Sequence, residues 1–164
     1  MLKYVDTRVC FAEIPDEITL CINLSNCPCH CKGCHSAYLA EDIGKELDEM
    51  ELSLLIESNN GISCVAFMGG DALPHDVHHL AMFVKEIYPH IKVAWYSGRD
   101  QIHVSAALNL QDYDFIKIGP YIPERGPLDN PNTNQKFYQV VNGELIDITY
   151  KFWKHETENQ SKEN

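Results

Sequence analysis

Residues 18–34 read ITLCINLSNCPCHCKGC, and this stretch decides the fold. Its first part, 18–24, places an apolar residue at every second position, which is the period of a β-strand with one buried face. A loop follows at once, and within eight residues it holds four cysteines: Cys27, Cys29, Cys31 and Cys34. The stretch therefore predicts a strand that ends in a loop rich in thiols.

The segments around this stretch alternate between strand and helix patterns. Further strands are predicted at 4–11, 63–68, 91–96 and 114–118, with helices at 50–58, 74–88 and near 102–110 and a closing hairpin at 135–141 and 145–152. This alternation favours an α/β fold with a mostly parallel sheet and helices on the outside. Because a complete (β/α) barrel takes about 250 residues, we expect an open, partial barrel.

Composition limits the class of protein. The chain has 164 residues and a formal net charge of −11, from 13 Lys+Arg and 24 Asp+Glu. An acidic chain is a poor partner for nucleic acid, whose phosphates bind clustered basic residues. No apolar run approaches the roughly 20 residues that cross a membrane, and residues 1–10 lack the apolar centre of a signal peptide. We therefore expect a cytoplasmic protein with one domain, 1–153, and a polar, disordered tail, 154–164.

The cysteines predict a metal centre. An odd total of seven, without an export signal, argues against a disulfide framework. Cys27, Cys31 and Cys34 have the spacing C-x3-C-x2-C, and three thiolates would hold three irons of a four-iron cluster and leave the fourth iron open. A structural zinc site usually takes four protein ligands in two separate knuckles, and no second knuckle is present.

Two other short segments are expected beside the cysteine loop. Gly69-Gly70-Asp71 follows the predicted strand 63–68, and Tyr96-Ser97-Gly98 lies at the end of strand 91–96. Ligands of α/β proteins gather at the carboxyl ends of the strands, so all three segments are predicted to line one rim.

These motifs resemble those of a known superfamily. C-x3-C-x2-C directly after a strand, with Gly69-Gly70-Asp71 after the next strand, is similar to the signature of the radical S-adenosylmethionine enzymes. Gly33 before the last cysteine, the short chain, Gly119-Pro-Tyr and the later Asn134-Gln-Lys resemble, more specifically, the activating proteins of anaerobic (class III) ribonucleotide reductase. This resemblance covers roughly residues 15–140 and makes 1–153 a radical S-adenosylmethionine domain.

The resemblance implies a chemistry and a set of residues. A [4Fe–4S] cluster would be held by Cys27, Cys31 and Cys34, and S-adenosylmethionine by Gly33, Cys34, His35, Gly69, Gly70 and Asp71. Of these, Gly69, Gly70 and Asp71 would hold the methionine end, and the backbone around Gly33 and His35 would contact the adenine. No side chain is assigned as a catalytic acid or base. The implied partners are the glycyl-radical subunit of anaerobic ribonucleotide reductase and a flavodoxin or ferredoxin as electron donor.

Departures from the family pattern leave alternatives. Met68 stands where Ser or Thr is usual, Ala72 stands where Pro is frequent, and Cys29 is an extra thiol that allows a four-cysteine ligand set. The target could instead be an enzyme of the pyruvate formate-lyase type, or the loop could be a zinc-binding module without enzymatic activity. The proline-rich loop 121–134 is interpreted either as a docking surface or as a variable surface loop.

Overall fold

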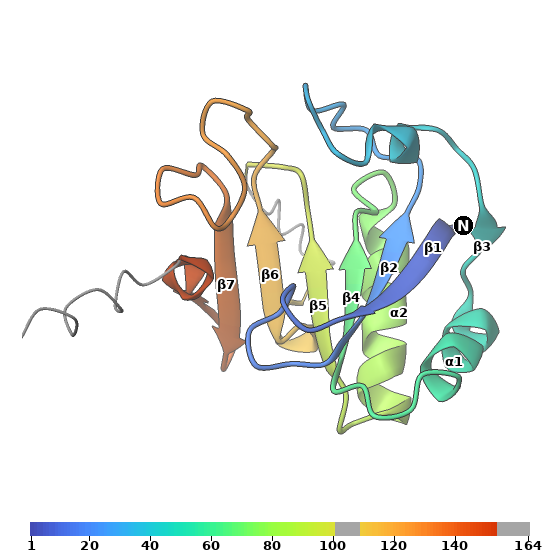
Figure 1. Ribbon diagram of the computed structural model, residues 1–164. Helices are drawn as coiled ribbons and strands as arrows, with labels where there is room; N and C mark the ends of the chain where they lie inside the picture. Colours follow the sequence, from blue (N-terminus) through green and yellow to red (C-terminus); the bar gives the residue numbers. More distant parts are fainter. Residues whose placement is uncertain (101–108, 154–164) are drawn as a thin grey trace, which may run out of the picture.

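The computed structural model describes residues 1–100 and 109–153, which form one mixed α/β unit (Figure 1). The strands are β1 (Lys3–Cys10), β2 (Thr19–Leu24), β3 (Lys45–Glu46), β4 (Cys64–Met68), β5 (Lys92–Tyr96), β6 (Phe115–Ile118), β7 (Lys136–Val141) and β8 (Glu144–Asp147). The α-helices are α1 (Glu49–Glu57) and α2 (Pro74–Ile87), and three short 3₁₀ turns are η1 (Ala37–Ala40), η2 (Leu110–Asp112) and η3 (Thr149–Phe152).

Most of the predicted elements are present within two residues of their expected ends. The helices begin where the sequence provides a start signal: the Asp48 side chain accepts from the backbone N–H of Glu51 at 2.8 Å before α1, and Pro74 occupies the first turn of α2. The two-residue strand β3 was not predicted, because so short a segment carries no periodicity. The helix predicted near 102–110 falls mainly outside the described residues, as does the predicted tail 154–164.

All the described strands belong to one sheet in the order β3-β1-β2-β4-β5-β6-β7-β8. The inner pairs β2–β4, β4–β5 and β5–β6 are parallel, whereas the four outer pairs are antiparallel. The prediction of a mostly parallel sheet is therefore wrong, and a partial barrel is not confirmed. The alternation of apolar residues marks a strand but not its direction, and the turns between β1 and β2 and between β7 and β8 contain no crossover helix, which parallel pairing requires.

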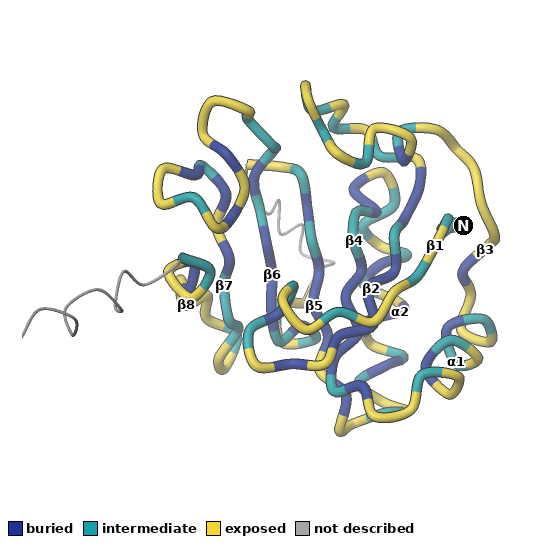
Figure 2. Tube along the Cα trace, in the orientation of Figure 1, coloured by how far each residue is buried: buried dark blue, intermediate teal, exposed yellow. Residues whose placement is uncertain are grey.

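The two faces of the sheet are covered differently. Helices α1 and α2 pack on one face, against side chains such as Ile22, Phe67 and Trp95 (Figure 1). On the opposite face, the β1–β2 connection lies across the sheet and buries Ile14 against Cys21, Ala66, Ala94 and Phe115. Figure 2 shows the inner strands as the most deeply buried part of the chain, with exposed loops around them.

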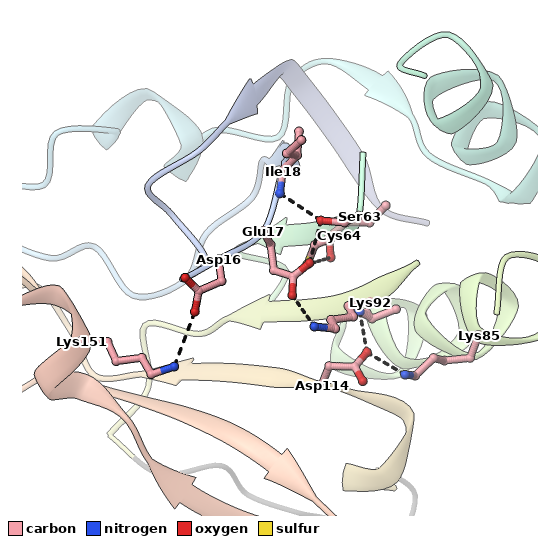
Figure 3. A network of polar contacts seen from close by, with 11 residues as sticks. Asp16, Glu17, Ile18, Ser63, Cys64, Lys85, Lys92, Asp114 and Lys151 are labelled. Carbon is pink, nitrogen blue, oxygen red and sulfur yellow. Dashed lines mark hydrogen bonds and ion pairs between the residues drawn. The ribbon is translucent and has the colours of Figure 1, made fainter. Parts of the chain in front are cut away.

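A polar network ties the amino-terminal ends of the inner strands together (Figure 3). The buried carboxylate of Glu17 accepts from the Ser63 hydroxyl at 2.6 Å and forms an ion pair with Lys92. Asp114 accepts from the backbone N–H of Val93 at 2.8 Å and from Lys85 Nζ at 2.6 Å. The carboxylates of Glu17 and Asp114 thus each connect neighbouring strands. Side-chain contacts fix the amino-terminal ends of the inner strands, whereas loops follow their carboxyl ends.

Candidate metal and cofactor site

The carboxyl ends of the inner strands meet around one cleft of about 900 Å³. Its lining includes residues from the cysteine loop after β2, from the glycine turn after β4, from the end of β5 and from the end of β6. In Figure 1 these segments lie together at the top of the sheet. The prediction that the three motif segments share one rim is confirmed.

The cleft brings together the thiols that the sequence singled out. Four cysteines line it, and all four are partly buried: Cys27, Cys29, Cys31 and Cys34. The loop that carries them is held by backbone hydrogen bonds, from Asn26 N–H to Glu41 and from Cys27 N–H to Leu39, both at 2.9 Å. Cysteines outside the cleft have structural positions, since Cys21 and Cys64 are buried in the sheet.

The thiols fit a cluster of several irons. In the described part of the chain, no group of three His, Cys, Asp or Glu side chains is arranged to hold a single metal ion. A [4Fe–4S] cluster takes cysteine thiolates at separate corners of a cube, and the cysteine loop presents thiols to a cleft with room beside them. The thiols that line the cleft are donors of the type that an iron–sulfur cluster takes.

One side chain from each inner strand forms the floor of the cleft. The register aligns Asn23 with Met68, Met68 with Tyr96, and Tyr96 with Lys117. All four line the cleft, and they lie on the face opposite to α2, because side chains alternate along a strand. The Tyr96 hydroxyl donates to the carbonyl of Glu13 at 2.5 Å, which attaches the β1–β2 connection to this floor.

Lys117 is a site residue that the sequence reasoning missed. Its side chain is buried, and Nζ donates to the carbonyl oxygens of Gly119 at 2.7 Å and Ser97 at 3.4 Å. Burial lowers the pKa of Lys117 to about 8, and the nearby Cys31 and Asp71 act in the opposite direction. A lysine in the otherwise apolar strand Phe115–Ile118, just before a Gly-Pro turn, was the available signal.

Asp71 lies in the cleft, but its side chain is directed toward the protein. It is 2% exposed. One carboxylate oxygen accepts from the Ser97 hydroxyl at 2.5 Å, and the other accepts from Gly98 N–H at 2.8 Å and from the Cys29 thiol at 3.6 Å. Asp71 thus joins the segments that follow β2, β4 and β5, whereas a direct contact with a ligand remains a prediction.

The predicted glycines occupy different surroundings. Gly69 lines the cleft, but Gly70 is buried, and a Cβ at Gly70 would lie 2.5 Å from Val77 Cγ2 and 2.9 Å from Leu24 Cδ1. Its backbone φ of +91° is also one that favours glycine. The structure therefore gives Gly70 a role in packing against α2.

The two remaining predicted residues lie where the cysteine loop meets the loop after β6. Gly33 is exposed, and a Cβ there would lie 3.1 Å from Cγ of Pro123. His35 lines the cleft, and its ring centroid lies 5.5 Å from that of Tyr121. The loop 121–134 therefore contacts the cysteine loop and contributes to the wall of the cleft.

Burial also affects the pKa of Cys29, the thiol that is extra to the C-x3-C-x2-C spacing. The pKa of Cys29 is raised to about 12, first by burial and then by the neighbouring Asp71 carboxylate and Cys27. Cys29 thus lies against the carboxylate of Asp71, on the segment that follows β4.

The comparisons with known proteins agree with this donor set. A family model described as a 4Fe-4S single cluster domain matches residues 18–142, from the start of β2 to the β7–β8 turn. The chain belongs to this family and is an iron–sulfur protein, a class compatible with redox enzymes. No curated protein and no solved structure matches the chain. The described residues contain no helix that is long and apolar enough to cross a bilayer.

Proposed function

We propose that this protein is a radical S-adenosylmethionine activase that places a glycyl radical on anaerobic ribonucleotide reductase. Two findings support this function: the C-x3-C-x2-C and Gly69-Gly70-Asp71 motifs resemble those of these enzymes, and the chain belongs to a 4Fe-4S family. The observation that carries it is the shared cleft, in which the cysteine loop, the glycine turn and the buried Lys117 line one space. A structural metal loop has no need of such a space beside its thiols.

Cys27, Cys31 and Cys34 would hold the cluster and leave one iron open. When bound, a reduced cluster together with S-adenosylmethionine would supply the radical chemistry that removes a hydrogen atom from a glycine of the partner. The residues of this chain bind and orient the reactants, which is the usual contribution of a protein that uses such cofactors.

The cleft offers charged and polar groups for the methionine end. The Lys117 ammonium is fixed by two backbone carbonyls and has a third proton for a carboxylate. Gly69 lines the cleft, and because it has no side chain its backbone is open to close approach by the methionine end of the ligand. Where the cysteine loop meets the loop after β6, the rings of His35 and Tyr121 would provide a surface for a purine.

Apolar side chains in the loops that line the cleft would receive the partner. They are Phe11 and Pro15 from the β1–β2 connection, Pro127 and Leu128 from the loop 121–134, and Phe152, and the charged Asp16, Asp129 and Lys151 lie among them in the lining. Phe11 is 74% exposed. Concave sites with mostly apolar linings are the usual binding sites of proteins, so these loops would suit a segment that brings a glycine to the cofactors.

The first experiment tests for S-adenosylmethionine cleavage. The chain is purified and reconstituted with iron and sulfide without oxygen, reduced with dithionite and given S-adenosylmethionine, and 5′-deoxyadenosine is measured. We expect a brown protein with about four irons per chain that forms 5′-deoxyadenosine. Cys31→Ala should abolish product, whereas Cys10→Ala, a thiol outside the cleft, should retain it. A colourless protein with one tightly bound zinc would instead support the zinc module.

A second experiment identifies the target. The reduced, reconstituted chain is mixed with the glycyl-radical subunit of an anaerobic ribonucleotide reductase, or with an enzyme of the pyruvate formate-lyase type, and the glycyl radical is measured by electron paramagnetic resonance. We expect the radical on the reductase only. A radical on the lyase only would contradict the assigned partner and leave the cleavage reaction intact.

A further inference from the structure

Cys29 occupies a different position in the site from the three cysteines of the C-x3-C-x2-C spacing. Its thiol donates to a carboxylate oxygen of Asp71, with 3.6 Å between sulfur and oxygen. Asp71 is almost fully buried and follows β4, so this contact attaches the cysteine loop to the next strand of the sheet. Among the cysteines of the loop, Cys29 is the one whose thiol is given a protein acceptor in the described structure.

Gly98 allows Cys29 to reach this position. A Cβ added at Gly98 would lie 2.8 Å from the Cys29 sulfur, which is closer than real Cβ contacts, and 3.2 Å from the Cys29 Cβ, which is tighter than most. The backbone N–H of Gly98 donates to the same carboxylate oxygen of Asp71, at 2.8 Å. Cys29, Asp71 and Gly98 therefore form one contact that joins the segments after β2, β4 and β5.

We propose that Cys29 is a positioning residue that holds the cysteine loop in place for the cluster and is itself no ligand. The Cys29 sulfur packs against Gly98 and lies 3.6 Å from a carboxylate oxygen of Asp71, so it contacts the segments that follow β4 and β5. With Cys29 fixed in this way, the loop on both sides of it is attached to the sheet, and the cluster keeps one iron without a protein ligand.

This inference rests on the iron–sulfur cluster and on the ligands Cys27, Cys31 and Cys34, and not on S-adenosylmethionine cleavage. A loop that is already ordered binds its metal with a smaller loss of conformational freedom. The expected consequence is that Cys29 affects how readily the cluster assembles, while the spectroscopic type of the cluster does not depend on it.

The first test compares two variants that separate positioning from ligation. Cys29→Ser keeps a hydroxyl that can donate to Asp71, Cys29→Ala keeps no donor, and Cys10→Ala removes a thiol outside the cleft. Each full-length chain is reconstituted with limiting ⁵⁷Fe and sulfide, and iron content and Mössbauer spectra are recorded. We expect Cys29→Ser and Cys10→Ala to match the wild type, and Cys29→Ala to assemble about fivefold less cluster, the effect of one lost hydrogen bond, with an unchanged spectrum.

The opposite results overturn the inference in two ways. If Cys29→Ser loses the cluster as fully as Cys31→Ala, or changes the ligation seen at one iron, then Cys29 is a ligand. If Cys29→Ala assembles the cluster as the wild type does, then Cys29 has no role in assembly. Neither result bears on whether S-adenosylmethionine is cleaved.

The second test uses the close contact with Gly98 and needs no cluster. Amide hydrogen exchange of residues 27–36 is followed in the metal-free chain for Gly98→Ala, Cys29→Ala and the double variant. We expect Gly98→Ala alone to speed exchange in this loop, because its new Cβ displaces the Cys29 sulfur, and to add little in the Cys29→Ala background. Additive effects of the two substitutions would show that they act independently and would overturn the proposed contact.

Discussion

The indole nitrogen of Trp95 donates a hydrogen bond to the carbonyl oxygen of Gly69, with 2.8 Å between the two atoms. Trp95 is buried on the helix-covered face of β5 and stacks on Tyr113. The contact passes from the core of the protein to the glycine turn that lines the cleft. The buried side chain of Trp95 thus fixes the position of the turn at Gly69 from the helix-covered face of the sheet.

Trp95→Phe removes this hydrogen bond and keeps most of the apolar surface. We expect a loss of about 1 kcal/mol in the free energy of unfolding, the usual contribution of such a bond, measured by urea denaturation of the metal-free chain. Trp153→Phe is the matched control, because the Trp153 indole nitrogen has no hydrogen-bond partner within residues 1–100 and 109–153. Equal losses for the two variants would mean that the bond to Gly69 contributes nothing.

Lys117 is expected to determine affinity for S-adenosylmethionine. Replacing its buried ammonium by the methionine side chain in Lys117→Met removes a charge-assisted hydrogen bond, so the Kd should rise about 10- to 100-fold. The measurement is titration calorimetry with the reconstituted chain under anaerobic conditions. Lys151→Met provides the control, since Lys151 lines the same cleft but pairs with Asp16 of the β1–β2 connection, at 3.6 Å. An unchanged Kd for Lys117→Met would remove Lys117 from the binding site.

Gly70→Ala should destabilise the fold more than an equivalent change at a glycine with free space. Gly61 has a similar φ, +88° against +91°, but a Cβ there would meet nothing within 4 Å. Both variants bear the backbone strain of about 1 kcal/mol or more, and Gly70→Ala adds overpacking against Val77 of about 1–3 kcal/mol. Urea denaturation measures the free energy of unfolding of each variant. Equal losses for Gly70→Ala and Gly61→Ala would show that the contact between residue 70 and Val77 of α2 adjusts without destabilising the fold.

The Glu17–Lys92 pair is expected to make stability depend on alkaline pH. The hydrogen bond that the Lys92 ammonium donates to the Glu17 carboxylate is the main cause that raises the pKa of Lys92. This stabilisation is complete below the ordinary lysine pKa of about 10.4 and is lost as the pH rises through the folded-state value. Glu17→Gln should therefore cost about 1–2 kcal/mol at pH 8, because Lys92 is half exposed and its pairing is partly screened.

The same variant should differ less from the wild type at pH 11, because above the ordinary lysine pKa of about 10.4 the unfolded chain releases this proton and the contribution of the pair declines. Urea denaturation at the two pH values measures this change, and the exposed Glu46→Gln provides the reference. A difference that stays constant between pH 8 and pH 11 would assign the effect of Glu17 to its hydrogen bond with Ser63.

Local patterns in the sequence predicted the elements and the position of the site. The alternation in 18–24 gave β2, the proline at position 74 gave the start of α2, and the rule that ligands gather at strand ends placed Cys27 and Gly69 on one rim. These features depend on residues near one another in the chain. Such periodicities and start signals are the information that a single sequence carries directly.

Features that depend on distant parts of the chain were not predicted. The antiparallel direction of the outer strands depends on which strands pair, and an apolar period of two is the same for parallel and antiparallel strands. The buried position of Gly70 follows from Val77 and Leu24, and the inward direction of Asp71 follows from Ser97 and Gly98. Lys117 enters the site because its register partner is Tyr96. Each of these needs the packed structure, in which residues far apart in sequence meet.

The floor of the cleft has a consequence for how this fold can diversify. Asn23, Met68, Tyr96 and Lys117 come from four separate strands at one level of the sheet, so a substitution at one of them leaves the strands of the others in place, although Tyr96 also holds the β1–β2 connection. The anchoring contacts of Glu17 and Asp114 lie at the opposite end of the same strands. Chains of this architecture are therefore free to acquire new ligand preferences through single substitutions, while the elements that keep them folded stay unchanged.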